Sequence, residues 1–370
     1  MIVREIKLKP TAMQRQKIDS SLWQMISVYN TALTRCLIGV ESGQFPSEFD
    51  LLTQFGGHSK KAGLNQNSIQ CCCKSARRAV ERWLFKDSSG KRFSRPHKKS
   101  ARNKIRTLVY GSASQIRHPK NGHVRIPSIG KVRCSKNEIP AGKQHGGRLI
   151  KRASGYYFQY VIENEHEQEV ISNAPVVGID PGFKTLLTLS DGTKFNNPRE
   201  LKKGAVRLAQ AARGKKYKLI GRLQERQKMR RKDRNHKISH KIVRNYSEIY
   251  YSNDNFEAIK VRFGKSIREA GLSGLLDMVT YKAQACGRLV RSVANKNSTR
   301  GCSACKALTG PSGLSDLGVR EWTCSACGAH HDRDINAAIN TLLLGQGLAS
   351  GEKVKNSFIN HFEEDSANVA

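Results

Sequence analysis

The first part of the chain changes from a strand-like to a helix-like pattern of apolar positions. Residues 2–9, IVREIKLK, alternate apolar and polar side chains, which predicts a strand with one buried face. Residues 18–37 repeat their apolar positions with a helical period, and a second helix is predicted over residues 68–85. Residues 40–65 are rich in glycine, serine and polar side chains and are expected to form a loop.

Short strands follow a basic run, KRFSRPHKKSARNKIR, in residues 86–107. Glycines and prolines then separate four short apolar segments, 124–126, 131–134, 148–151 and 156–162. Together with residues 2–9 these segments predict a small β-barrel into which the two helices are inserted.

Strands and helices alternate after Pro175, as is typical of an α/β domain. Strands are predicted at 176–179, 185–189, 249–251 and 289–293, and helices at 272–283 and 336–344. Residues 201–245 predict one long helix or a helical hairpin, and residues 346–370 a flexible tail.

The net charge of +35, from 65 lysines and arginines against 30 acidic residues, indicates a polyanionic partner. Nucleic acid is the usual one, because its phosphates release counterions when cationic side chains replace them. A membrane surface is the competing interpretation, but it needs a basic amphipathic segment with bulky apolar residues, and no clear one is present. The chain also lacks a run of eighteen apolar residues, so no membrane partner is expected.

Basic residues are densest in residues 201–245, where seventeen lysines and arginines stand against Glu225 and Asp233. Such a helix is either a solvated surface or a nucleic-acid contact, and this charge density favours the contact. The candidate nucleic-acid ligands are Lys215, Lys216, Arg222, Arg226, Arg230, Arg231, Lys232 and Arg234.

Cysteine usage fits a reducing compartment. The first ten residues lack the apolar core of a signal peptide, so we expect a cytoplasmic, nucleoid-associated bacterial protein. Cys71, Cys72 and Cys73 are consecutive, which is poor geometry for separate disulfides. Cys72 and its neighbours are interpreted as buried or half-buried thiols on the helix at 68–85.

Four of the ten cysteines form two matched pairs, Cys302-Ser-Ala-Cys305 and Cys324-Ser-Ala-Cys327. Each pair can close a tight knuckle around one ion, and the spacing between the pairs is that of a zinc ribbon. Four thiolates leave a tetrahedral ion no open position, so the predicted Zn²⁺ is structural. Four unrelated free cysteines are the alternative, and it does not account for two matched pairs.

Two aspartates stand where a nuclease would carry metal ligands. Asp180 ends a predicted strand in GIDPG, although Asp-Pro-Gly is also a common turn. Asp334 lies in HDRDINAA at the start of a predicted helix, where acidic residues are also ordinary caps. The order of a strand-borne Asp, a zinc ribbon and this helix start is more specific than either motif alone.

The motifs GIDPGFKTLLTLSDG, KSIREAG, REWTCSACG and HDRDINAAIN, with the zinc ribbon, resemble the C-terminal half of TnpB proteins. These are compact RNA-guided nucleases of transposons, related to the type V CRISPR effectors. The segments IKLKPT, YNTAL and VRIPSIGKV resemble the family more weakly, and the resemblance covers roughly residues 1–345.

The resemblance implies an α/β multidomain architecture. It places a wedge β-barrel at 1–10 and 100–170 and a helical recognition insert at 11–99. It places a RuvC-like domain of RNase H fold at 171–297 and 331–345, with the zinc ribbon at 298–330. The implied partners are a guide RNA of the omega type and a double-stranded DNA target with a short flanking motif.

Family nuclease centres use three acidic residues that hold two Mg²⁺ ions. The first maps onto Asp180 and the last onto Asp334, whereas the middle Glu position holds Ser252. A hydroxyl is a poor Mg²⁺ ligand compared with a carboxylate. Asp254 has the same strand parity about 7 Å further along and would substitute only after a shift in register.

The leading hypothesis is an RNA-guided DNA-binding protein with a degenerate centre that cuts poorly or not at all. It resembles the nuclease-dead TnpB-like repressors called TldR, which block transcription. One rival is an active transposon endonuclease that uses Asp254 or another acid and needs Mg²⁺. The other rival is a zinc-ribbon DNA-binding protein that works without a guide.

Overall fold

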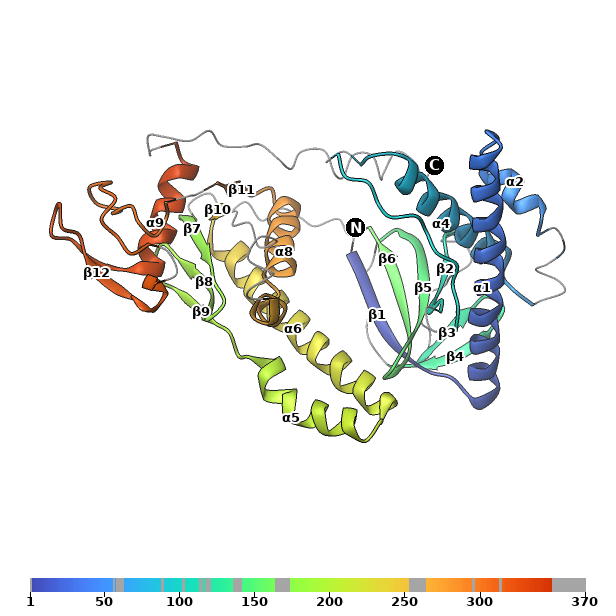
Figure 1. Ribbon diagram of the computed structural model, residues 1–370. Coiled ribbons are helices and arrows are strands. Elements are labelled where there is room, and N and C mark those ends of the chain that lie inside the picture. Colours follow the sequence, from blue (N-terminus) through green and yellow to red (C-terminus); the bar gives the residue numbers. More distant parts are fainter. Residues whose placement is uncertain are drawn as a thin grey trace. The chain divides into compact units, whose positions relative to one another are not determined.

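The protein divides into two compact units, residues 1–165 and 166–370 (Figure 1). The computed structural model describes residues 2–55, 57, 63–87, 90–101, 104–112, 116, 121–135, 142–163, 174–252, 264–294, 297–312 and 315–347. The predicted tail beyond residue 347 therefore lies outside the described residues.

A six-stranded antiparallel sheet forms the first unit, in the order β2-β5-β6-β1-β4-β3. Its strands are β1 (Ile2–Lys9), β2 (Thr107–Tyr110), β3 (His123–Ile126), β4 (Gly130–Cys134), β5 (Gln144–Arg152) and β6 (Gly155–Ile162). The N-terminal strand β1 is central, because it pairs with β6 along its length and with β4 at Leu8 and Lys9. The sheet is a half-barrel with β2 and β3 at its edges (Figure 1), and β2 was not predicted from the sequence.

Three helices described by the structure lie between β1 and β2 in the chain: α1 (Ala12–Glu41), α2 (Glu48–Thr53) and α4 (Gln66–Leu84). Thr11 caps α1 in a capping box with Gln14. The expectation of a loop over 40–65 is wrong at α2. This helix begins at a second capping box, formed by Ser47 and Asp50.

One face of α4 is buried. Ile69, Cys73, Ala76 and Val80 are buried against α1 and the sheet. Cys72 lies beside this face and is half-buried, which agrees with its interpretation as a structural thiol.

The second unit contains a five-stranded mixed sheet in the order β11-β10-β7-β8-β9. Its strands are β7 (Val176–Pro181), β8 (Thr185–Leu189), β9 (Lys194–Asn196), β10 (Glu248–Ser252) and β11 (Leu289–Val293). Strands β7, β8 and β9 are antiparallel neighbours, and β10 and β11 continue the sheet parallel to β7. The short strand β9 was not predicted.

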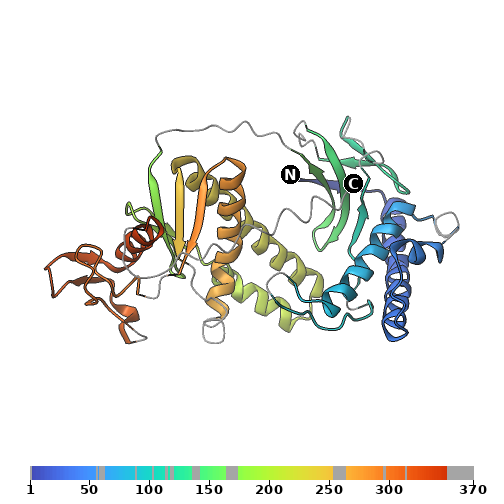
Figure 2. The same ribbon diagram turned by 90° about the horizontal axis from the view of Figure 1, so that it is seen from above.

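Helices cover both faces of this sheet (Figure 2). Residues 201–245 form a hairpin of α5 (Glu200–Arg213) and α6 (Tyr217–Asn245), one of the two predicted alternatives. The end of α6 and α8 (Leu272–Ala285) pack on Val177, Ile179 and Ile249, and α9 (Arg333–Gly345) covers the opposite face.

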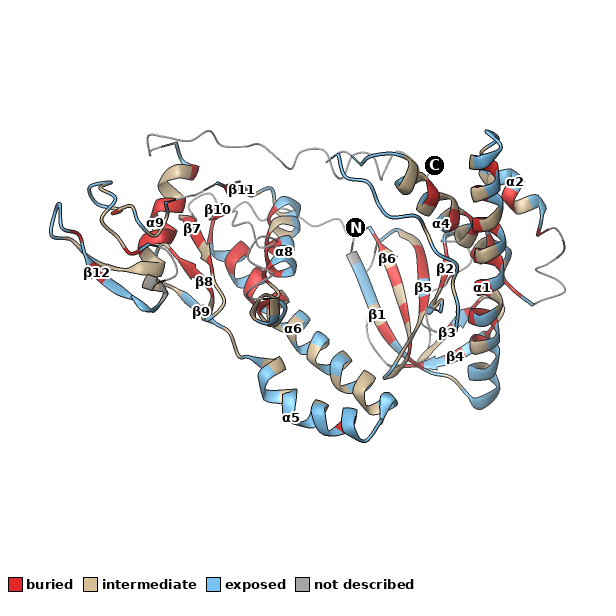
Figure 3. Cartoon of the chain, in the orientation of Figure 1, coloured by how far each residue is buried: buried red, intermediate tan, exposed pale blue. Residues whose placement is uncertain are grey.

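The two ends of the α5–α6 hairpin differ in how far their side chains are buried (Figure 3). Ile238, Ile242 and Val243, near the end of α6, are in the core, whereas α5 and the first half of α6 are largely exposed. In the parts of the chain that the structure describes, no helix combines the length and apolar character needed to cross a membrane.

Candidate metal and nucleic-acid sites

Two backbone turns with the same hydrogen bonds carry the four paired cysteines. Cys302 N–H donates to Ala307 O over 2.9 Å, and Lys306 N–H donates to Cys302 O over 2.9 Å. The second turn repeats both bonds, from Cys324 to Ala329 and from Gly328 to Cys324. Lys306 and Gly328 occupy equivalent positions with φ of 68° and 72°, so each turn closes through a left-handed residue.

The four thiols of Cys302, Cys305, Cys324 and Cys327 converge, with all Sγ atoms within 4.8 Å of one another. The sulfurs of Cys302 and Cys327 are 3.7 Å apart, and those of Cys305 and Cys324 are 3.6 Å apart. Four sulfurs that each lie about 2.3 Å from one tetrahedral zinc ion are separated by about 3.8 Å. The cluster therefore has the dimensions of a four-thiolate metal site.

Neighbouring groups stabilise the thiolate form of one of these cysteines and contact another. The Thr309 hydroxyl donates to Cys324 Sγ over 3.1 Å and, with further donors, lowers the pKa of that thiol to about 6. His331 Nε2 lies 3.0 Å from Cys302 Sγ, and its ring contacts Trp322 with centroids 4.9 Å apart. Such outer contacts orient metal ligands. Thr309 and His331 were not selected from the sequence, because their proximity depends on how β12 (Glu321–Thr323) and β13 (His330–Asp332) pair.

Asp180 and Ser252 occupy neighbouring positions on adjacent parallel strands. The register of β7 and β10 pairs Gly178 with Tyr250 and Ile179 with Tyr251, so its continuation brings Asp180 level with Ser252. Parallel strands in register present paired residues on the same face, about 4.8 Å apart. Ser252 is fully buried there, while Asp180 is half-buried.

Helix α9 covers the face that carries these two residues. A Cβ atom on Gly178 would lie 2.1 Å from Ala338 O, so the helix packs directly against β7. Asp180 follows Gly178 by two residues on that face, and Asp334 precedes Ala338 by one helical turn. Asp180, Ser252 and Asp334 thus belong to the same interface between the sheet and α9.

Two acidic residues at the start of α9, Asp332 and Asp334, have different surroundings, and only one of them caps the helix. Asp332 is the N-cap, and its carboxylate accepts from the Asp334 and Ile335 amides, each over 3.0 Å. Burial alone would raise the pKa of Asp332, but the Lys194 ammonium and these amides lower it below its usual range. Asp334 is not the cap, and its Oδ2 lies 3.5 Å from Arg320 Nη1.

Two acidic residues lie close to Ser252 in the sequence, Glu248 and Asp254. Glu248 lies at the other end of β10, where the Tyr250 hydroxyl donates to its carboxylate over 2.8 Å. Asp254 lies outside the described residues. Within the described residues, the four-cysteine cluster is the one group of three or more metal-ligating side chains that converge.

The candidate basic residues of the hairpin fall into two groups. Five are exposed, in the turn before α6 or along α6 itself: Lys215, Lys216, Arg222, Arg226 and Lys232. The other three, including the exposed Arg230, make contacts within the protein. Arg230 pairs with Glu200 at 2.9 Å, Arg231 donates to Arg268 O over 2.7 Å, and Arg234 donates to Ala270 O over 2.6 Å.

Arg234 is the most enclosed of these cations, and burial lowers the pKa of its guanidinium. Its guanidinium also donates to the Asn235 side chain over 2.8 Å. The structure therefore gives Arg234 a role in holding α6 against residues 264–270, which are helical. Sequence periodicity did not reveal this role because the partner carbonyl lies 36 residues away.

Comparison with known proteins gives two family matches. A family model described as "Probable transposase" matches residues 159–261, and one described as "Cas12f1-like, TNB domain" matches residues 273–341.

Two relatives each match a little over three fifths of this chain. A protein of Streptomyces pristinaespiralis, called "Putative RNA-guided DNA endonuclease", is 30% identical over 250 residues, which are 62% of this chain and 60% of the relative. The InsQ protein of Escherichia coli K12, of the same description, is 24% identical over 266 residues, 64% of this chain and 65% of InsQ. This chain thus spans about three fifths of the length of the relatives it matches.

A solved Cas12f1 complex with single guide RNA and target DNA overlaps 92% of this chain and 99% of its own, with 15% identity and a TM-score of 0.35. The sequence matches define a class of proteins related to transposases and Cas12f1. Within that class, the chain is similar to proteins described as TnpB-like, such as the TnpB-like protein L79 of Acanthamoeba polyphaga mimivirus, which is 24% identical over 197 residues, 45% of this chain and 37% of that protein.

Proposed function

We propose that this TnpB-like protein binds double-stranded DNA under the direction of a guide RNA and leaves the DNA uncut. Base pairing with the guide would select the target, and the protein would recognise only a short flanking duplex motif. Bound at a promoter, the complex would block transcription as a TldR-type repressor does.

The observation that carries the loss of cleavage is the position of Ser252. It is fully buried and level with Asp180 on the adjacent parallel strand, where a carboxylate would complete a ligand set with Asp180 and Asp334. A two-metal nuclease needs ligands that hold both ions about 4 Å apart. Two carboxylates and a neutral hydroxyl do not supply the charge for such a pair of ions. This donor set does not fit a two-Mg²⁺ centre.

The topology supports a nuclease ancestry. Three antiparallel strands, β9-β8-β7, are continued by two strands parallel to β7, with helices on both faces. This is the arrangement expected of the RuvC-like domain that the family resemblance implies. The half-barrel of the first unit, with helices between its first two strands, is likewise compatible with a wedge domain and recognition insert.

The zinc assignment rests on the donor set. Four soft thiolates at tetrahedral spacing select zinc over Mg²⁺, which prefers oxygen ligands. All four positions around the ion would be filled by Cys302, Cys305, Cys324 and Cys327. Zinc would therefore stabilise this segment and take no part in chemistry.

The active-endonuclease alternative is favoured by the description of the Streptomyces and E. coli relatives as RNA-guided DNA endonucleases. It requires a third ligand from outside the described residues, such as Asp254.

The proposal is tested by sequencing the RNA that copurifies with the protein and then measuring binding of duplexes that match or mismatch its guide segment. We expect a defined RNA and tight binding of the matched duplex only. If the DNA specificity is the same after ribonuclease treatment, the guide-independent zinc-ribbon alternative replaces the proposal.

A further inference from the structure

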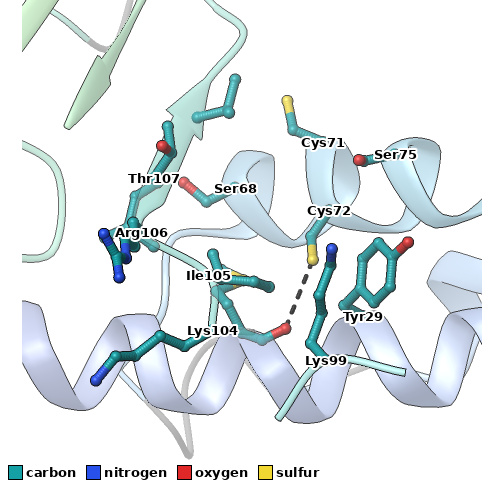
Figure 4. Close-up of a pocket in the computed structure, with 13 residues that line it drawn as sticks. Tyr29, Ser68, Cys71, Cys72, Ser75, Lys99, Lys104, Ile105, Arg106 and Thr107 are labelled. Carbon is teal, nitrogen blue, oxygen red and sulfur yellow. Dashed lines mark hydrogen bonds between the residues drawn. The ribbon is translucent and has the colours of Figure 1, made fainter. Parts of the chain in front are cut away.

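A pocket of about 270 Å³ lies in the first unit, between α1, α4 and the segment that leads into β2 (Figure 4). It does not include any of the residues considered above for metal or nucleic-acid binding. Its size is slightly below the range of about 300–1,000 Å³ that is usual for small-molecule sites. This volume is large enough for one planar heterocycle with a sugar and too small for several nucleotides of a nucleic-acid strand.

One buried polar group in this pocket has no partner. Ser68 is 4% exposed and lines the pocket, and its Oγ makes no hydrogen bond with any described residue. A buried hydroxyl without a partner is destabilising, so a ligand group that reached it and formed a hydrogen bond would be favoured. Cys71 adds a second polar group from the same helix, and its sulfur points away from that of Cys72 (Figure 4).

Cations surround the pocket. Lys99, Lys104 and Arg106 all line it, and no carboxylate does so among the described residues. Lys99 is held in place because its amide donates to Asn30 Oδ1 over 2.7 Å and its carbonyl accepts from Asn30 Nδ2 over 2.9 Å. Its ammonium lies 5.3 Å from the centre of the Tyr29 ring. This charge favours an anionic ligand and disfavours a metal ion at Cys71 and Cys72.

The remaining wall is apolar and comes from Met25, Ile105 and Leu108, with Tyr29 beside them. A small inorganic anion would gain nothing from this wall. A nucleotide would bury its base there and place its phosphate near the cations, since bases combine an apolar face with polar edges.

We propose that this pocket binds a single unpaired nucleotide, with the base near Ser68 and the phosphate near Lys104 and Arg106. The inference rests on the proposed function in one respect: the guide RNA is then the source of that nucleotide. A free mononucleotide has the same chemistry, and the experiment below distinguishes the two sources.

Cys71 provides a residue-specific probe. It lines the pocket and is partly exposed, so a bound nucleotide should slow its alkylation by a maleimide. Cys286 is also partly exposed but lies in the second unit, and it serves as the internal control. Rates at each cysteine are read by mass spectrometry on the full chain, with its copurified RNA and after removal of that RNA.

The RNA-free protein is titrated with AMP, CMP, GMP and UMP, and with inorganic phosphate as the comparison. A nucleotide at about ten times its Kd should slow Cys71 alkylation about tenfold by mass action. Phosphate should not slow it, and Cys286 should be unaffected. Ser75→Phe, at an exposed lining position, should abolish the protection by filling the pocket mouth.

Lys104→Glu and Arg106→Glu should weaken the protection, whereas Lys131→Glu, an exposed position on β4, should not. Protection by bound RNA but not by mononucleotides supports the guide as the source. Protection by mononucleotides in a protein that retains no RNA supports the pocket and contradicts the proposed function. Equal protection by phosphate, or RNA retention with no change at Cys71 under any condition, overturns the pocket proposal and leaves the proposed function standing.

Discussion

At the scale of single residues, the two cysteine turns differ at one position. Lys306 and Gly328 both have left-handed φ values, but only glycine adopts this conformation without steric cost. A residue with a side chain pays roughly 1–2 kcal/mol of steric strain in this region. Glycine avoids this strain, but its greater conformational entropy in the unfolded chain offsets part of the advantage.

We therefore expect Lys306→Gly to raise the free energy of unfolding by up to about 1 kcal/mol. Gly328→Ala, its matched counterpart, should lower it by a similar amount. Denaturant unfolding of the metal-loaded protein measures both. Destabilisation by Lys306→Gly would show that the lysine side chain, which donates to Ser303 O over 3.1 Å, matters more than the backbone conformation.

The thiol cluster predicts a metal content. Freshly purified protein should contain about one zinc per chain, and Cys305→Ser should lose the metal and destabilise the local fold, because ligand binding and folding are coupled. Cys286→Ser removes a thiol outside the cluster and should keep both. Elemental analysis gives the ratio, and zinc-free wild-type protein would contradict the assignment.

Ser252 predicts a metal-dependent change in stability. Replacing this fully buried residue with Glu places a carboxylate near Asp180, which should destabilise the protein in the absence of divalent ions. Mg²⁺ should then raise the Tm of Ser252→Glu more than that of the wild type or of the uncharged Ser252→Gln. The same Mg²⁺ response in all three proteins would mean that position 252 does not join a metal site.

At the scale of elements, the sequence predicted most strands and helices with their order. Alternation identified β1, and helical periodicity identified α1, α4, α8 and α9. The misses have two causes. Strands β2, β9, β12 and β13 have three or four residues, too few to display a period. Helix α2 begins at a capping box inside a polar segment that resembles a loop.

The sites were predictable to different degrees. The four-cysteine cluster was predictable because two matched Cys-x-x-Cys pairs constrain the geometry of a metal site by themselves. The level position of Asp180 and Ser252 depends on strand register, which the sequence does not specify. The division of the hairpin cations into exposed and internally bound groups depends on Glu200, Arg268 and Ala270, which periodicity does not relate to α6.

That division sharpens the test of the hairpin. Lys215, Lys216, Arg222 and Arg226 are exposed, so changing all four to Gln should weaken RNA binding with little effect on folding. Four lost phosphate contacts should reduce the slope of log K against log salt by about 3. Arg234→Gln should instead lower the stability, because it removes the contact to Ala270 O.

The matched control for the hairpin is four Gln substitutions at exposed cations of the first unit, Arg4, Arg125, Lys131 and Arg133. An equal loss of affinity in this control would mean that net charge, rather than the hairpin, sets RNA binding. RNA affinities of both variants, measured over a series of salt concentrations, distinguish these two possibilities.

The molecule as a whole combines three features. A net charge of +35 suits a polyanionic partner, a four-thiolate cluster suits a structural metal, and a sheet-and-helix interface retains two of the three expected acids. Each feature is compatible with a nuclease. Under the proposed function, the buried serine level with Asp180 is the feature that distinguishes a DNA-binding complex from a DNA-cutting one.

The most direct test is cleavage of a guide-matched duplex in Mg²⁺ by the protein with its copurified RNA, measured together with binding in the same sample. We predict a bound and intact duplex. Losing one metal ion removes several kcal/mol of transition-state stabilisation, so cleavage should be at least about a thousandfold slower than by an active family nuclease assayed in parallel. Guide-dependent cleavage that Asp180→Ala abolishes would contradict the account and establish the protein as an active endonuclease.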